Sequence, residues 1–281
     1  MKIAITGATG QLGNVVVQKL KEKTASENLV ALVRNPEKAA DLGIEARLFD
    51  YAKPESLASS LQGIDILLLI SGNEIGQREV QHKNVINAAK EAGVKRIVYT
   101  SLLHANTSAL ILAPEHLATE NALSDSGVDY TILRNGWYTE NYAVSIAGAI
   151  KAGGFIGSAG EGKISSATRE DFAEAAAVVL TASGHENKIY ELAGDQAYTL
   201  TDFAAEISKQ TGKNIPYNNL PEADFAHILI SVGLPESFAN LLANCDVKAS
   251  ERALYSEDKT LSKLIGRPTT PFATVIKNFI S

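Results

Sequence analysis

The sequence has almost no cysteine: Cys245 is the single one in 281 residues. A lone cysteine excludes an intramolecular disulfide and any metal cage built from cysteines, and it suits the cytosol. The longest apolar runs, such as Ile64 to Ile70, are far shorter than the about 20 residues that span a bilayer. The opening segment MKIAITGATG lacks a signal-peptide pattern, since glycine enters at Gly7. We therefore expect a cytoplasmic protein that does not cross a membrane.

The sequence also lacks a block of basic residues. The net charge is −6, and charged residues make up 21% of the chain. A mildly acidic chain of this kind is a poor binder of nucleic acid or of anionic membranes. No grouping of His, Asp and Glu has metal-ligand spacing, so no metal site is expected. The hydrophobic fraction of 45% is that of an ordinary globular protein.

The first half of the chain alternates short apolar runs with helical segments. Six such repeats with uniformly apolar strands predict a parallel sheet covered by helices on both faces, which is a Rossmann-type doubly wound α/β fold. The strands are expected at residues 2–6, 29–33, 46–49, 66–70, 96–100 and 129–133, and the helices at 12–22, 54–61, 80–92 and 115–125.

The second half changes character. Five glycines between Gly153 and Gly162 indicate a loop-rich stretch. Helices are expected at 168–181, capped by Thr168, and at 201–210, capped by Thr201; strands are expected at 188–192 and 217–220. These elements predict a smaller C-terminal α/β lobe. We expect residues 1–135, with parts of 165–195, to form an NADP(H)-binding Rossmann domain, and residues 136–164 and 196–281 to form a substrate lobe.

The run TGATGQLG, residues 6–13, carries the most information. It follows a strand and opens a helix, which is the context of a dinucleotide-binding fingerprint. Gly7 permits a tight turn, Gly10 lets the backbone approach a pyrophosphate, and Gly13 lets the helix pack closely on the strand. The helix N-terminus then offers N–H groups to the phosphates. The alternative is a glycine-rich turn in a flavodoxin-like fold without a nucleotide.

The end of the second strand indicates which nicotinamide cofactor is bound. An NAD enzyme usually has Asp or Glu there for the ribose 2′-OH, whereas this chain has Arg34. A guanidinium holding the 2′-phosphate favours NADP(H) by roughly 10- to 150-fold. The alternative is a solvated arginine at a strand end. Asp50 follows the third strand, where an aspartate can either contact the adenine or cap a turn. Ser71, Gly72 and Asn73 follow the fourth strand, near the expected position of the nicotinamide ribose.

The chain lacks the Tyr-x-x-x-Lys pair of short-chain dehydrogenases. The nearest equivalent is His116-x-x-x-Glu120, and a glutamate raises the pKa of a neighbouring phenol rather than lowering it. Ketone reduction and sugar-nucleotide epimerisation by that route are therefore disfavoured. A quinone accepts hydride directly, and binding geometry supplies most of the catalysis. The scattered histidines, His82 and His104 included, are more typical of structural or exposed positions.

An aromatic and polar segment follows the sixth strand. A flat aromatic acceptor would suit such a cluster at the carboxyl end of a strand, and a hydrophobic hinge between lobes is the alternative. The residues of this candidate acceptor pocket run from Arg134 to Tyr142, with Trp137, Tyr138 and Asn141 foremost.

Several segments together resemble a known family. The runs TGATGQLG, VRNPEK, LLLISGNE, GQREVQHKNVINAAKEAGV, YTSLLHA, LRNGWYTENY, SATREDFAEAA and KTLSKLIGRPTT are similar to those of the NmrA-like atypical short-chain dehydrogenases. The glycine motif is shared widely, whereas GWYTENY and SATREDFA are much more specific. The similarity extends through nearly the whole chain.

This resemblance implies an NADPH-dependent reductase of quinones, with the quinone as a small-molecule partner. The family also includes non-catalytic NADP(H) redox sensors, which are the alternative reading. The oligomeric state stays open, a homodimer included. The resemblance implies that the pyrophosphate is bound by Gly7, Thr9, Gly10, Gln11, Leu12 and Gly13, and the 2′-phosphate by Arg34. It implies that the ribose and nicotinamide are lined by Ser71, Gly72 and Asn73. It also implies that the cofactor and acceptor are bordered by Trp137, Tyr138, Thr139, Glu140 and Asn141, and that Arg169 reaches toward the site.

Overall fold

The computed structural model describes residues 1–280. The chain forms two compact units, each assembled from separate stretches. The first comprises Met1–Asn106, Leu112–Asn135 and Arg169–Glu191; the second comprises Thr107–Ile111, Gly136–Thr168 and the chain from Leu192 onward. The roles predicted for a Rossmann domain and a substrate lobe remain predictions.

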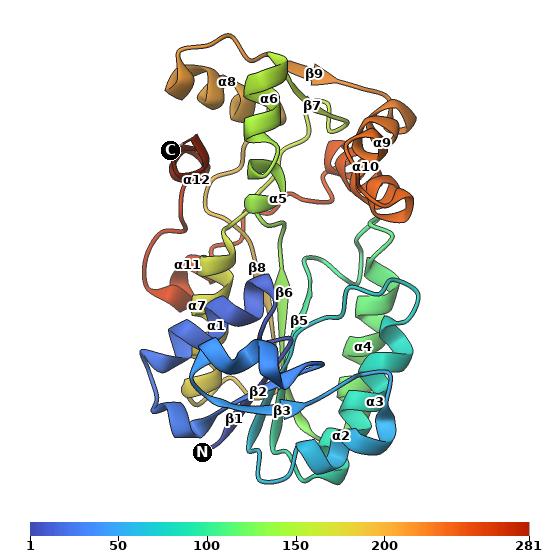
Figure 1. The fold of residues 1–281 in the computed structure, drawn as a ribbon, viewed down its shortest axis with the longest axis vertical. Helices are drawn as coiled ribbons and strands as arrows, with labels where there is room; N and C mark the ends of the chain where they lie inside the picture. The colour runs from blue at the N-terminus through green and yellow to red at the C-terminus, as the bar shows by residue number, and fades with distance from the viewer. Residues whose placement is uncertain (281) are drawn as a thin grey trace. The chain divides into compact units, whose positions relative to one another are not determined.

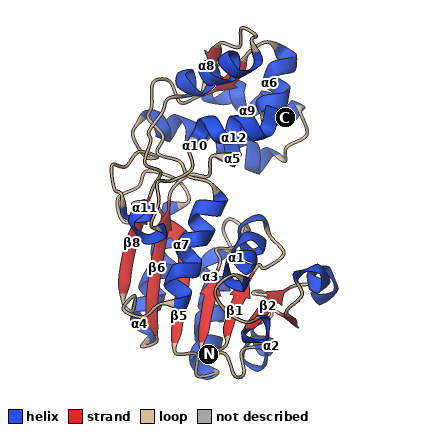
Figure 2. Cartoon of the chain, turned by 90° about the vertical axis from the view of Figure 1, so that its left-hand side faces the viewer, coloured by secondary structure: helices blue, strands red, loops and turns tan. Residues whose placement is uncertain are grey.

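The first unit is built on a seven-stranded sheet, whose strands lie side by side in Figure 2. Their order is β3-β2-β1-β4-β5-β6-β8, and the pairs from β3 through β6 are parallel. This arrangement confirms the predicted Rossmann-type doubly wound sheet. The strands are β1 (Ile3–Thr6), β2 (Leu29–Val33), β3 (Glu45–Leu48), β4 (Ile66–Leu69), β5 (Arg96–Leu102), β6 (Asp129–Asn135) and β8 (Lys188–Leu192).

Helices cover both faces of this sheet, which explains why its central strands are continuous apolar runs. Helices α1 (Gln11–Lys21) and α7 (Arg169–Thr181) pack together on one face, while α2 (Pro54–Ser60), α3 (Arg78–Glu91) and α4 (Ala113–Ser126) follow one another on the other (Figure 1). Every residue of β1, β2, β4 and β5 is buried. Short 3₁₀ helices span Ser26–Asn28 and Pro36–Leu42.

The strand order creates a switch point between β1 and β4. The chain moves outward from β1 to β2 and β3, then returns to place β4 on the other side of β1. Ligands of open α/β sheets bind at the carboxyl ends of the strands beside such a point. The loops that follow β1, β2 and β4 therefore carry the candidate site.

The second unit has an aromatic core. Phe203 lies against Tyr198 and Phe155, with ring centroids 5.7 and 5.3 Å away, and Phe272 lies 4.4 Å from Tyr198. A two-stranded parallel sheet joins β7 and β9. The elements are α5 (Glu140–Ala143), α6 (Ile146–Ala152), β7 (Phe155–Gly157), α8 (Leu200–Thr211), β9 (Tyr217–Asn219), α9 (Glu222–Ser231), α10 (Glu236–Ser250), α11 (Thr260–Ile265) and α12 (Phe272–Ile280).

The predicted boundaries differ from the structure in a few places. Helix α8 begins at Leu200, one residue before its predicted start, and its cap is Thr199 rather than Thr201: the Thr199 hydroxyl accepts from the Asp202 N–H, and Asp202 accepts from the Thr199 N–H. Such a reciprocal capping box satisfies two backbone donors. Strands β5 and β6 each run two residues beyond their predicted ends, to Leu102 and Asn135.

Candidate functional site

The glycine loop after β1 makes the turn that the motif predicts. Gly7 has a φ of +58°, in the left-handed region that favours glycine. Its N–H donates to the Leu32 carbonyl at 3.0 Å, and its own carbonyl accepts from the Gly10 N–H at 2.8 Å. Gly10 precedes α1 with extended backbone, and no described side chain caps the helix. The first N–H groups of α1 thus form a ready anion site. Thr9 and Gln11 are exposed here, and Leu12 is buried.

Gly13 lies against the glycine loop itself. A Cβ added at Gly13 would lie 2.2 Å from the Gly7 carbonyl oxygen and 2.9 Å from the Ala8 Cα. No real Cβ approaches backbone so closely, so any side chain would push α1 away from the loop. The close approach expected of Gly13 is therefore present, but toward the loop rather than along the strand.

Arg34 follows β2 with an exposed side chain. Its Nη1 lies 3.3 Å from Glu74 Oε1, and the two side chains are 70% and 50% exposed. The guanidinium is thus at the carboxyl edge of the sheet and accessible to a ligand. Asp50, after β3, makes a turn: its Oδ1 accepts from the Ala52 N–H at 3.1 Å, and Lys53 lies 3.8 Å from its other oxygen. The predicted adenine contact stays a prediction.

The loop after β4 is held by side chains from α3 and β5. The Ser71 N–H donates to Thr100 Oγ1 at 2.9 Å. The Gly72 N–H donates to His82 Nε2 at 3.0 Å, and the Gly72 carbonyl accepts from Arg78 Nε at 2.5 Å. Both polar groups of Gly72 are therefore fixed by side chains from α3, which positions the segment predicted to line the ribose and nicotinamide.

His82 was not recognised from the sequence as part of this arrangement. It is fully buried, and burial, aided by the Arg78 charge, lowers the pKa of its imidazole to about 4. Its Nδ1 lies 2.9 Å from Thr119 Oγ1, and that hydroxyl donates to the Glu115 carbonyl. Thr119 therefore accepts from Nδ1–H, which leaves Nε2 as the acceptor that Gly72 needs. No sequence signal marks a contact between this loop and a histidine ten positions further on, inside α3.

Tyr51 is a second residue that sequence reasoning missed. Its hydroxyl contacts Thr6 Oγ1 at 2.5 Å and donates to the Ile70 carbonyl at 2.9 Å. The Thr6 hydroxyl oxygen also accepts from the Ile70 N–H at 2.9 Å. Burial raises the pKa of this phenol far above its usual value. Tyr51 therefore ties the ends of β1 and β4 together beneath the candidate site.

The residues in place of the dehydrogenase Tyr-Lys pair have other partners. His116 Nδ1 lies 2.7 Å from the Tyr99 hydroxyl, and burial lowers the pKa of this imidazole to about 3. Glu120 accepts from Arg134 at 2.9 and 2.6 Å and from the Ser101 hydroxyl at 2.5 Å. The structure thus closes this position with a buried ion pair instead of presenting an acid to a substrate.

The segment 137–141 belongs to the second unit. The Thr139 N–H donates to the Ala167 carbonyl at 3.0 Å, and its hydroxyl lies 2.8 Å from Ser166 Oγ. Tyr138 forms a parallel bridge with Ala167. Trp137 Nε1 is buried and has no hydrogen-bond partner among the described residues. Helix α5 begins at Glu140 and includes Asn141; in the first unit, Arg169 opens α7.

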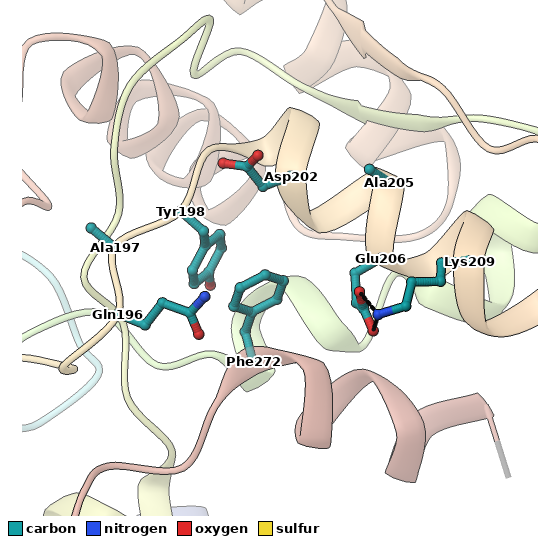
Figure 3. A pocket seen from close by; sticks show the side chains of 8 residues that line it. All are labelled: Gln196, Ala197, Tyr198, Asp202, Ala205, Glu206, Lys209 and Phe272. Atoms are coloured by element: carbon teal, nitrogen blue, oxygen red, sulfur yellow. Dashed lines mark hydrogen bonds and ion pairs between the residues drawn. The ribbon is translucent and has the colours of Figure 1, made fainter.

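A pocket of about 410 Å³ lies elsewhere in the second unit, between α8 and α12 (Figure 3). Its charged groups already have partners, since Asp202 caps α8 and Glu206 pairs with Lys209 at 3.0 Å. We assign it no ligand. Within residues 1–280, no cluster of three or more His, Cys, Asp or Glu is arranged to hold a metal, and no helix is long and apolar enough to cross a membrane.

Comparison with known proteins gives the family. The family described as NAD(P)H-binding matches residues 7–195. The chain belongs to the NAD(P)H-binding family. It is 57% identical to quinone oxidoreductase 2 of Escherichia coli, over 99% of both chains. A crystal structure of that NADPH-dependent quinone oxidoreductase, in complex with NADPH, matches with a TM-score of 0.96 over 99% of this chain and 100% of the other.

Two further relatives extend the comparison. The triphenylmethane reductase of Citrobacter sp., solved with NADP(H), is 39% identical, with a TM-score of 0.95 over 99% of this chain and all of that chain. An NmrA-like family domain-containing oxidoreductase of Aspergillus flavus is 26% identical over 100% of this chain and 95% of its own. The expected resemblance to NmrA-like proteins, and among them to bacterial NAD(P)H:quinone oxidoreductase 2, is confirmed.

Proposed function

We propose that this chain is an NADPH-dependent reductase of quinones, an NAD(P)H:quinone oxidoreductase. The observation that carries the proposal is the full-length similarity to Escherichia coli quinone oxidoreductase 2, at 57% identity. The geometry of the first unit is consistent with it. The glycine loop, the uncapped start of α1 and the exposed Arg34 all lie at the carboxyl edge of the sheet.

The residues present fit the cofactor. Gly13 leaves no room for a Cβ, so backbone alone would form the cradle beneath a pyrophosphate. Arg34 would bind the 2′-phosphate, and Ser71, Gly72 and Asn73 would contact the ribose and nicotinamide. In the second unit, the buried Trp137 Nε1–H needs an acceptor, because unpaired buried donors are costly. The remaining proposed contacts come from Thr9, Gln11, Leu12, Asp50, Tyr138, Thr139, Glu140, Asn141 and Arg169.

The reaction fits a site without a strong general acid. NADPH supplies a hydride, and a quinone that accepts it becomes a hydroquinone anion that water can protonate. The chain's task is then to bind the two molecules, orient them and exclude competing chemistry. Glu120 does not serve as that general acid, because Arg134 and Ser101 hold its carboxylate in a buried cluster. Trp137, Tyr138 and Asn141 are the proposed acceptor contacts.

The first test is oxidation of NADPH, followed by its nicotinamide absorbance, with benzoquinone or menadione as acceptor and NADH in parallel. We expect quinone-dependent turnover that favours NADPH. Tight NADPH binding without turnover across several quinones would instead support a non-catalytic redox sensor.

A second test addresses Arg34. Because its guanidinium can form charge-assisted bonds with the 2′-phosphate, Arg34→Ala should weaken NADPH binding by roughly 10- to 150-fold. NADH binding should change little. A variant that kept the full NADPH preference would remove the role assigned to this arginine.

A further inference from the structure

The partner of Arg34 stands on the opposite side of the glycine loop. Arg34 follows β2, and Glu74 follows β4. In the sheet, β1 lies between these two strands. The contact of 3.3 Å between Arg34 Nη1 and Glu74 Oε1 therefore spans the carboxyl end of β1, where the loop from Gly7 to Gly13 begins.

Glu74 is held in place from the other side. The Gln81 Nε2 of α3 donates to Glu74 Oε2 at 2.8 Å, and Gln81 is only 8% exposed. The backbone of the same loop is fixed as well, since the Gly76 N–H donates to Glu115 Oε1 at 2.8 Å. The carboxylate is thus a positioned anion beside Arg34, although its side chain is half exposed.

We propose that Glu74 is a specificity-determining residue whose carboxylate competes with a 2′-phosphate for the Arg34 guanidinium. This inference rests on the proposed role of Arg34. A carboxylate and a phosphate compete for the same guanidinium donors, and they repel each other at close range. Glu74 therefore lowers affinity for ligands with a 2′-phosphate and leaves ligands without one unaffected.

The test uses cofactor fragments and needs no turnover. Adenosine 2′,5′-bisphosphate and 5′-AMP are titrated into the full chain by isothermal titration calorimetry. Releasing an exposed ion pair is a small cost, so Glu74→Gln should tighten the bisphosphate by about two- to fivefold. Binding of 5′-AMP should not change. The variant keeps the size of the side chain and a polar partner for Gln81.

Glu79→Gln is the matched control. Glu79 lies on α3 and pairs with Lys83 at 2.7 Å, so its loss changes the net charge equally without touching Arg34. A gain seen with Glu74→Gln but not with Glu79→Gln supports direct competition. An equal gain in both variants, no gain, or weaker binding in Glu74→Gln overturns it.

The double variant Arg34→Gln/Glu74→Gln separates the two proposals. If Glu74 acts through Arg34, the double variant should bind the bisphosphate no more tightly than Arg34→Gln alone does. Tighter binding by the double variant overturns the inference. If wild-type protein binds the bisphosphate and 5′-AMP equally, the proposed role of Arg34 fails first. If wild type prefers the bisphosphate and Glu74→Gln adds nothing, only the inference about Glu74 fails.

Discussion

Arg134 holds both carboxylate oxygens of Glu120: its Nε and Nη2 donate at 2.9 and 2.6 Å, and the two side chains are 10% and 5% exposed. The same guanidinium donates to Glu191 at 2.8 Å. This bidentate pair joins α4 to β6 at the position where a short-chain dehydrogenase has its catalytic lysine. In such an enzyme the charged group at this position assists proton transfer, whereas here the ion pair of Glu120 and Arg134 stabilises the fold.

Glu120→Gln should therefore destabilise the protein. Removing one partner of a buried pair leaves the other charge uncompensated, which costs about 3–5 kcal/mol. Because Glu191 still accepts from Arg134, we expect the lower end of that range. Urea unfolding followed by circular dichroism measures the free energy of unfolding. Glu91→Gln, an exposed change at the end of α3, should stay within about 0.5 kcal/mol of wild type. If Glu120→Gln lowered the free energy of unfolding no more than Glu91→Gln does, the ion pair would contribute little to stability.

The sequence predicts those features of the fold that depend on neighbouring residues. The apolar runs of β1 and β2 and the glycine spacing from Gly7 to Gly13 are local patterns, so the sheet and the cradle at its edge could be predicted. The parallel pairing of β7 with β9 joins segments about sixty residues apart. No local pattern encodes such a pairing.

Long-range polar contacts were missed for the same reason. His82 appeared as one of several scattered histidines, yet its ring accepts from Gly72 and contacts Thr119. Glu120 could be recognised as the wrong residue for a dehydrogenase, but not as the partner of Arg134. The choice of Thr201 rather than Thr199 as the α8 cap was a local error: either threonine can cap a helix, but only Thr199 has an acidic residue, Asp202, three positions on.

Gly13→Ala should weaken cofactor binding. The added methyl would lie 2.2 Å from the Gly7 carbonyl oxygen, so α1 must shift away from the loop that forms the cradle. Overpacking of this kind costs about 1–3 kcal/mol, so we expect a loss of NADPH affinity of about 5- to 150-fold, measured by nicotinamide fluorescence. Gly148→Ala in α6, where a Cβ meets nothing within 4 Å, should bind NADPH as wild type does. Unchanged binding in Gly13→Ala would contradict the assigned cradle.

His82 should make the first unit lose stability in mild acid. Its pKa is about 4 in the folded protein and about 6.5 when unfolded. The unfolded state therefore takes up a proton as pH falls below 6.5, which the buried ring resists until about pH 4. Stability from this group is complete above pH 6.5 and declines by about 3 kcal/mol toward pH 4.

His82→Gln should make this slope shallower, while His116, whose pKa burial also lowers, to about 3, keeps the rest of it. A glutamine oxygen can still accept from Gly72 but does not titrate. The free energy of unfolding is measured between pH 4 and 7 by circular dichroism, with His227→Gln on the exposed face of α9 as the baseline for this type of substitution. If the free energy of unfolding depended on pH in the same way in wild type and His82→Gln, protonation of the His82 ring would not cause the loss of stability.

Asp246 should give the second unit the opposite dependence on pH. Its Oδ1 accepts from the Tyr142 hydroxyl at 2.8 Å and its Oδ2 from the Ser158 N–H at 3.0 Å. Burial outweighs these bonds and raises the pKa of the carboxyl to about 6. The unfolded carboxyl ionises near pH 3.9. Between these values the folded state holds a proton that the unfolded state releases, so stability falls as pH rises from about 4 to 6, by roughly 3 kcal/mol.

Asp246→Asn removes this titration, so the difference in unfolding free energy between wild type and variant should change across pH 4–6 and stay constant above it. Trp137, the single tryptophan, lies in the same unit, and its fluorescence reports that unit's unfolding in urea. Asp125→Asn, an exposed change in α4, supplies the baseline. A constant difference across the whole range would mean that the Tyr142 and Ser158 bonds compensate for burial and keep Asp246 ionised. A change in this difference that is confined to pH 4–6 would show that the proton resides on this buried carboxyl.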